Sequence, residues 1–322
     1  MVHLRIVAPH EEALRALRVL EATDSVINVI VMEGAARKPP GDVILADVPR
    51  EDASVVIADL RHLQIDECGS ISIEPIETQL SAAADRAERS AAGAPADAVI
   101  WEEVMDRTSE ESTLSGTFLA FMIQAMLIAA VGIFHDSPIL VVGAMVVGPE
   151  FGPIAATCVA LIQRRGGLAV RSLTALVVGF PLGIAVTVAV TWLLKETGVT
   201  PSTFTSDNHH LSNSIANPDF LAFFVAFCAG IAGMLSLTTA KSGALIGVLV
   251  SVTTIPAAAN TAVAFVYGDW ASWRGSLEQL LLNIAGIHLA GLLTLGVQRQ
   301  FYVRRRRAHR ASMRARGIED TP

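Results

Sequence analysis

Residues 138–162 read PILVVGAMVVGPEFGPIAATCVALI, an apolar run in which Glu150 is the one charged side chain. About 20 consecutive apolar residues are enough for a helix to cross the hydrocarbon core of a bilayer. This run is long enough to do so, but Pro149 and Pro153 interrupt it, because proline lacks a backbone donor and disrupts helical hydrogen bonding. The stretch therefore predicts a transmembrane helix that is broken near its middle.

The composition of the whole chain agrees with a membrane protein. Of its 322 residues, 52% are hydrophobic and only 17% are charged, which is too apolar for a pair of soluble domains. From residue 114 onward, six apolar stretches are each long enough to span a membrane. They lie near 114–134, 138–162, 168–194, 219–240, 243–267 and 277–297. We expect a membrane all-α bundle of six transmembrane helices.

The distribution of charge predicts the topology of this bundle. Residues 1–113 carry 22 acids against 10 bases, whereas the tail from Gln298 carries eight arginines against two acids. The basic residues expected on the side of the N-terminus are Arg164, Arg165, Arg171, Lys241 and the arginines at 304–307, while the opposite loops hold only Lys195 and Arg274. The positive-inside rule then predicts a multi-pass protein of the inner (plasma) membrane with both termini cytoplasmic. The N-terminus also lacks the pattern of a secretion signal.

The residues before the bundle alternate between strand and helix periodicities. The predicted strands are 4–8, 25–32, 42–48 and 70–76, the predicted helices are 9–21 and 49–63, and a turn is predicted over 34–41. This βαββαβ order predicts a ferredoxin-like α+β cytoplasmic domain over residues 1–76. Residues 77–113 are interpreted as a linker and an interfacial amphipathic helix with Trp101 at headgroup level, or alternatively as an ordinary helix packed on protein. The transmembrane domain takes 114–297, and 298–322 form a basic cytoplasmic tail.

The two halves of the transmembrane domain match when they are offset by about a hundred residues. Phe118–Phe121 resembles Phe220–Phe223, and Gly143 matches Gly247. Pro153 matches Pro256 with one residue of slippage, and Thr157-x-Val-Ala matches Thr261-x-Val-Ala. Because each copy has three spans, the second copy must enter from the opposite side. The sequence predicts an inverted 3+3 repeat with broken second and fifth helices, although chance matches between Ala- and Gly-rich helices are the alternative.

Inverted repeats with interrupted helices are the usual build of secondary transporters, whose sites lie where the breaks meet. A charged side chain in a span costs about 3 kcal/mol, so Glu150 is a candidate to take up a proton or coordinate a cation. The predicted substrate- or ion-binding residues are Glu150, Gly148, Pro149, Gly152, Pro153, Thr253, Thr254, Pro256, Asn260 and Gln124. The alternative is a break at the membrane edge that leaves Glu150 solvated. Asn283 and His288 are interpreted as interhelical hydrogen-bonding residues.

No catalytic pattern is visible in the sequence. It has no phosphate loop, no nucleophile elbow and no dinucleotide fingerprint, so we expect neither an enzyme nor a cofactor. Cys68, Cys158 and Cys228 lie far apart, and His209-His210 has no further ligands nearby, so no metal site is predicted. The arginine tail follows a span, which favours topology and contact with anionic lipid over nucleic-acid binding.

The segment Ala129–Ile133, followed by Asp136-Ser137-Pro138 and by Val142–Pro149, resembles the hallmark of domain-of-unknown-function family 389. This family comprises uncharacterised conserved hydrophobic domain membrane proteins of bacteria and archaea. The similarity runs from about Trp101 to Val297, and it implies a polytopic membrane protein without an established substrate. Many members carry an apolar residue such as Leu where this chain has Glu150, which implies a coupling feature of a subgroup or a tolerated variation.

We therefore expect a secondary transporter of a small solute or ion with a cytoplasmic regulatory or oligomerisation domain. The alternatives are an ion channel and a membrane-anchored ligand sensor whose bundle is a scaffold, and an intramembrane enzyme is least favoured. Because an open sheet leaves unpaired edge groups, a homo-oligomer, most simply a dimer, is expected.

Overall fold

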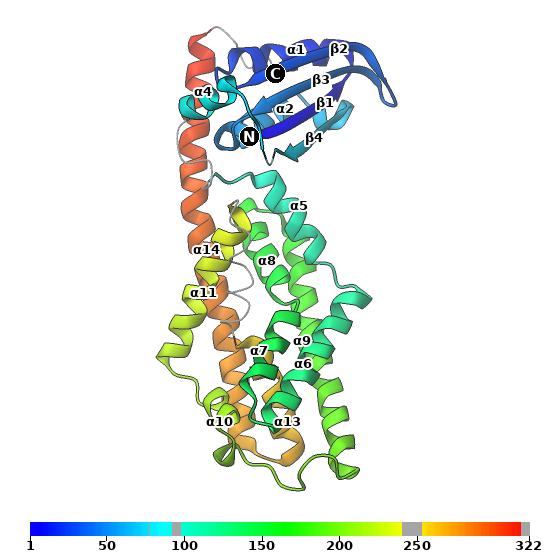
Figure 1. Ribbon diagram of the computed structural model, residues 1–322, viewed down its shortest axis with the longest axis vertical. Helices are drawn as coiled ribbons and strands as arrows, with labels where there is room; N and C mark the ends of the chain where they lie inside the picture. Colours follow the sequence, from blue (N-terminus) through cyan, green and yellow to red (C-terminus); the bar gives the residue numbers. More distant parts are fainter. Residues whose placement is uncertain (77, 92–97, 240–252, 317–322) are drawn as a thin grey trace. The chain divides into compact units, whose positions relative to one another are not determined.

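The computed structural model describes residues 1–76, 78–91, 98–239 and 253–316 (Figure 1). The chain divides into two compact units. The first holds Met1–Val104, residues 238–239 and the end of the last helix from Gln298. The second holds Met105–Leu237 and the described residues that follow, up to Val297.

The first unit contains a small antiparallel sheet of four strands in the order β2-β3-β1-β4 (Figure 1). The strands are β1 Val2–Ala8, β2 Ile27–Arg37, β3 Pro40–Val48 and β4 Ser70–Pro75. Along β1 the apolar side chains alternate in burial, as period-two spacing requires for a sheet with one covered face. Two helices, α1 His10–Ala22 and α2 Arg50–His62, contribute Leu20 and Leu60 to the same core. A short helix, α3 Ile65–Cys68, leads into β4.

The hairpin between β2 and β3 is longer than the sequence predicts. Its strands pair as far as Arg37 opposite Pro40, so the predicted turn over 34–41 is wrong. Gly34, which has a φ of +59°, lies instead at an irregularity within β2, and its N–H donates to Asp42 Oδ1 at 2.7 Å. A glycine at positive φ is as compatible with a bulge as with a turn, which is why its position misleads.

The segment predicted as a linker contains a helix, α4 Ala82–Ser90. The Ser81 hydroxyl caps it by accepting from the N–H groups of Ala83 and Ala84 at 3.2 and 3.4 Å. The next helix, α5, runs from Trp101 to Glu111, close to the predicted amphipathic helix. Trp101 is buried and packs edge-on against Tyr302, with ring centroids 6.3 Å apart, which agrees with the alternative of a helix packed on protein.

Four described helices are long and apolar enough to cross a membrane. They are α6 Gly116–Phe134, α9 Gly166–Glu196, α11 Phe220–Thr238 and α14 Trp270–Ala315. A fifth span arises if α7 Pro138–Val147 and α8 Phe151–Gln163, which are bent by 46° at their break, count as one. The apolar helix α13 Thr254–Tyr267 is shorter, and the rest of the predicted span 243–267, including Gly247, lies outside the described residues. These helices indicate a multi-pass membrane protein.

The last helix extends far beyond its predicted span of 277–297. α14 has 46 residues, which is roughly 70 Å at 1.5 Å per residue. It therefore continues through most of the predicted tail, because the charged residues there are good helix formers although they lack apolar periodicity. Between α9 and α11 lie a short 3-10 helix, η2 Ser206–Asn208, and α10 His210–Ala216, whose first N–H groups donate to Asp136.

Candidate functional site

The break between α7 and α8 follows from its prolines and glycines. Gly148 ends α7, donating its N–H to Ala144 O at 3.1 Å, and Glu150 occupies the position before the first residue of α8. Pro153 is the third residue of α8, within the first turn, where a missing donor leaves no intrahelical bond unmade. The chain can therefore start a new helix here, tilted against the previous one.

Helix α13 begins in the same way. Thr253 precedes its first residue, and Pro256 is its third residue, as Pro153 is in α8. Both helices are buried over their first ten or more residues, Phe151–Ala160 in α8 and Thr254–Ala264 in α13. The two short helices that follow the predicted breaks are thus central to the second unit.

The ends of α8 and α13 match as well. Arg164 and Gly268 both adopt the left-handed conformation after the last turn. The following N–H groups, of Arg165 and Asp269, donate to Ala160 O at 2.8 Å and Ala264 O at 3.0 Å, the pattern of a Schellman cap. The matching residues at these ends are 104 positions apart, as are Glu150 and Thr254, whereas Pro153 and Pro256 at the starts are 103 apart.

Glu150 and Thr254 are in direct contact. The Thr254 hydroxyl donates to Glu150 Oε1 at 2.5 Å, and the Glu150 side chain is only 6% exposed. Within the described part of the chain, the other carboxyl oxygen, Oε2, has no hydrogen-bond partner. It lies against Gly148, where a Cβ atom would come within 2.4 Å of Oε2 and 2.7 Å of Ile255 Cγ1. Glycine at this position therefore lets the side chains of Glu150 and Ile255 approach the backbone this closely.

The neighbouring hydroxyl, Thr253, belongs to a second polar group. Asn283 Nδ2 donates to Thr253 Oγ1 at 2.9 Å, and Gln279 Nε2 donates to Asn283 Oδ1 at 2.9 Å. Gln279 is 3% exposed and Asn283 is 1% exposed. Gln279 is not among the site residues predicted from the sequence, although its spacing of four residues from Asn283 puts both amides on one face of α14.

This amide chain lies at a cavity of 460 Å³ in the second unit. Its described lining residues are Asn213, Ser214, Ile215, Asn217, Asp219, Leu221, Ala222, Val225, Ala226, Thr253, Gln279 and Asn283. Among them, Asp219 is the single residue with a charged side chain. Asp219 is not among the residues predicted from the sequence, because an acid just before an apolar run is typical of a helix cap.

Other predicted site residues lie elsewhere. Asn260 bonds to Ser212 and Ser276 in a separate buried cluster, and Gln124 is exposed on α6. Gly152 lies against Glu111, because a Cβ atom added at Gly152 would be 2.7 Å from the Cβ of Glu111. His288 Nδ1 contacts Ile284 O, one turn earlier in the same helix. The geometry thus unites Gly148, Glu150 and Thr254, and it joins Thr253 to Asn283, but it leaves Asn260 and Gln124 apart.

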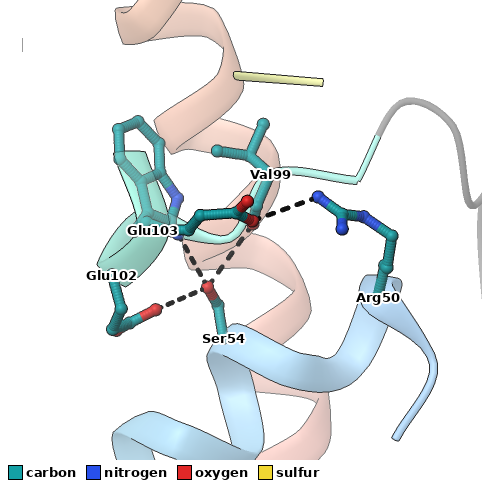
Figure 2. Close-up of polar contacts among 6 residues, drawn as sticks. Arg50, Ser54, Val99, Glu102 and Glu103 are labelled. Atoms are coloured by element: carbon teal, nitrogen blue, oxygen red, sulfur yellow. Dashed lines mark hydrogen bonds and ion pairs between the residues drawn. The ribbon is translucent and has the colours of Figure 1, made fainter. Parts of the chain in front are cut away.

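The first unit has its own buried polar cluster, centred on Ser54 of α2 (Figure 2). The Ser54 hydroxyl accepts from the Trp101 N–H at 3.0 Å and donates to Glu102 Oε2 at 2.9 Å. Arg50 bonds to Glu103 Oε2 at 3.3 Å beside it. Burial raises the pKa of Glu102 above the ordinary value for a glutamate. The cluster fastens the first turn of α5 to α2.

The end of α14 also contacts the first unit's acidic residues. Arg305 donates to the backbone carbonyl of Glu51, His309 Nε2 lies 3.2 Å from Asp59 Oδ2, and Arg316 pairs with Asp24 at 2.5 Å. Some acidic residues of 1–113 therefore pair with basic residues of the tail. The sequence pattern predicts that these arginines set the topology and contact lipid, and it does not predict these contacts within the protein.

Several apolar helices, one of them broken beside a buried carboxyl, place the chain among multi-pass membrane proteins. Residues 145–289 match the family model described as "Domain of unknown function (DUF389)", so the resemblance noted in the sequence is confirmed for this segment. An uncharacterized protein of Methanocaldococcus jannaschii is 26% identical over 203 residues, which cover 61% of this chain and 58% of that protein. The chain thus spans less than two thirds of this relative's length. No solved structure matches the chain significantly.

Proposed function

We propose that the protein is a secondary transporter of a small solute or ion, with Glu150 as the group that binds the coupling proton or cation. The observation that carries the proposal is the hydrogen bond between Glu150, which precedes α8, and Thr254, the first residue of α13, so that the starts of the two helices are in contact. In an inverted repeat, matching positions meet at the pseudo-two-fold axis, which is where transporters of this build bind their ligands.

Close helix packing in both halves supports the inverted repeat. In the first half, an added Cβ at Gly179 of α9 would lie 2.8 Å from Phe118 of α6. In the second half, an added Cβ at Gly230 of α11 would lie 2.8 Å from Ala290 of α14. In each half, the third span thus packs on the first through a glycine, as small residues permit at membrane helix interfaces.

The chemistry of Glu150 suits a group that changes its occupancy. A buried carboxyl without a cationic partner is stable when it is protonated, whereas its ionised form needs water or a bound cation. Thr254 satisfies one oxygen in either state, and Oε2 is left for the proton or cation. Separation of α8 from α13 would let water reach this oxygen, so the exchange of the ion is coupled to a change of conformation.

The first unit completes the proposal as a cytoplasmic domain of the ferredoxin-like type, with both termini inside the plasma membrane. Its edge strand β2 exposes Ile30, Val31 and Met32, of which Ile30 is 52% exposed. An apolar, unpaired edge favours pairing with a second copy, so we expect a homodimer. Native mass spectrometry that shows a monomer at every concentration would contradict the dimer but not the transport.

The experiment that tests the transport is flux in proteoliposomes that contain a pH-sensitive dye. A panel of small amines, carboxylates and inorganic ions is added outside, and coupled flux appears as a change of internal pH. We expect Glu150→Gln to abolish the pH change, while the control Glu111→Gln, an exposed carboxyl beside the same break, leaves it intact. Flux with unaltered coupling in Glu150→Gln would refute the role of Glu150, and unitary currents without a coupling ion would identify a channel.

A further inference from the structure

The cavity beside Thr253 has the dimensions of a site for an organic solute. Its volume of 460 Å³ lies within the range of about 300–1,000 Å³ that small-molecule sites occupy. One bare metal ion would leave most of this space empty. Its lining joins α10, α11, the start of α13 and α14, so four segments of the second unit contribute to it.

A buried amide with an unused acceptor lines this cavity. Gln279 is 3% exposed, and its Nε2 donates to Asn283, which in turn donates to Thr253. Its carbonyl oxygen, Oε1, has no hydrogen-bond partner among the residues that the structure describes. Buried polar atoms nearly always have a partner, so an unpaired acceptor at the edge of a cavity indicates a ligand that supplies a donor.

The charge of the cavity also favours a ligand that donates hydrogen bonds. Asp219 caps α11, where its Oδ1 accepts from the Ala222 N–H at 2.8 Å, and the residue is otherwise exposed at the mouth of the cavity. The described lining residues include no lysine, arginine or histidine. The site therefore offers acceptors and one negative charge. Ile215, Leu221 and Val225 supply apolar surface beside these groups.

We infer that this cavity binds a small organic cation, with an ammonium group that donates to Gln279 Oε1 and the Asp219 carboxylate and a short hydrocarbon part that contacts Leu221 and Val225. This inference rests on the proposed function, because it names the class of substrate that the transporter would carry. The binding itself can be measured without any transport.

The placement of the two threonines links this cavity to Glu150. Thr253 bonds to the amide chain of the cavity, while the next residue, Thr254, bonds to the buried carboxyl. Movement of the start of α13 on binding would therefore alter the contact of Glu150. The solute and the coupling ion thus act on consecutive residues of one helix.

The test is calorimetric titration of the purified full-length protein with ethylammonium chloride, and with sodium acetate as an anion of similar size. We expect ethylammonium to bind and acetate not to bind. Asp219→Asn removes the charge but keeps a good helix cap, and Gln279→Leu removes the free acceptor. Each should weaken ethylammonium binding at least tenfold. Gln298→Leu is the matched control, because Gln298 is a glutamine of the same helix that lies outside the cavity lining and whose Oε1 also has no partner in the described part of the chain.

Three results would overturn the inference: no binding of ethylammonium, binding of acetate, or an affinity that Asp219→Asn and Gln279→Leu leave unchanged. Failure of the proposed function gives a different result. If ethylammonium binds in the cavity but no solute crosses the membrane of proteoliposomes, the site stands and the transport does not. If flux occurs and the cavity variants do not alter it, transport stands and the assignment of this cavity falls.

Discussion

Replacement of Thr254 by valine isolates the contact between the starts of α8 and α13. Valine is β-branched and has nearly the volume of threonine, so the change removes the hydroxyl with little change in shape. Among the described residues, the Glu150 carboxyl then loses its one side-chain hydrogen-bond partner while it stays buried. We expect a loss of folding free energy, because an orphaned buried polar group keeps its full desolvation penalty.

The size of this loss depends on the charge of Glu150. A hydrogen bond to a charged group contributes about 1.5–3 kcal/mol and one between neutral groups about 1 kcal/mol. Hydrogen bonds between membrane helices average roughly 0.6 kcal/mol and reach about 1.7 kcal/mol. We therefore expect Thr254→Val to cost about 1–1.5 kcal/mol if Glu150 is protonated at rest. A value of about 2 kcal/mol or more would indicate an ionised carboxyl.

Reversible unfolding in mixed detergent and SDS micelles measures this loss. The matched control is Thr261→Val in the same helix, whose hydroxyl bonds to Ala257 O at 2.8 Å within α13 and leaves no orphan when it is removed. That variant should cost less than about 0.5 kcal/mol. In a Glu150→Leu background, Thr254→Val should also have little effect, because there is no carboxyl to satisfy. Equal losses in Thr254→Val and Thr261→Val, or no coupling between positions 150 and 254, would refute the reasoning.

Three further substitutions test the packing and the first unit. Gly148→Ala places a Cβ 2.4 Å from Glu150 Oε2 and should cost about 1–3 kcal/mol by overpacking, whereas Gly143→Ala, with open space around it, should be neutral or stabilising in the same unfolding assay. Ser54→Ala removes the three hydrogen bonds of its hydroxyl, with Val99 O, Glu102 and the Trp101 N–H, and should cost about 1–3 kcal/mol, seen as a lower Tm of the first unit by scanning calorimetry. Glu51 is 4% exposed and burial raises its pKa, so the folded protein loses stability as pH rises through that pKa. Glu51→Gln should therefore raise Tm at pH 8 and have no effect near pH 4, and an equal gain at both values would contradict the assignment.

Local patterns predicted most of the first unit and the apolar helices. Alternation along Val2–Ala8 and helical spacing along Arg50–His62 reflect burial on one face, which a single sequence records directly. The break before α8 and the start of α13 were also predictable, because Pro153 and Pro256 favour the first turn of a helix. The extent of α14 was not, since its last turns are held by contacts such as that of Arg305 with Glu51, which lie 254 residues apart.

The candidate site was also only partly predictable from the sequence. Glu150 stood out because a charge in an apolar run is rare, and its pairing with Thr254 was expected from the predicted repeat. Gln124 looked equally polar within a span, but it is exposed on its helix and joins no other site residue. Which face of a helix turns inward depends on its neighbours, and residues such as Gln279 acquire their role only when another segment closes a cavity over them.

The energetics of position 150 bear on whether it serves packing or function. A leucine there would fill a similar volume and leave no unpaired oxygen, so it would be the more stable choice for a site that only packs. The carboxyl instead needs Thr254 for one oxygen, Gly148 for room, and a proton or cation for the other oxygen. If Glu150→Leu is at least as stable as the natural protein but fails in coupled flux, stability and function are separated at this position. That separation is what a group dedicated to ion coupling predicts, and a purely structural glutamate would show the opposite order.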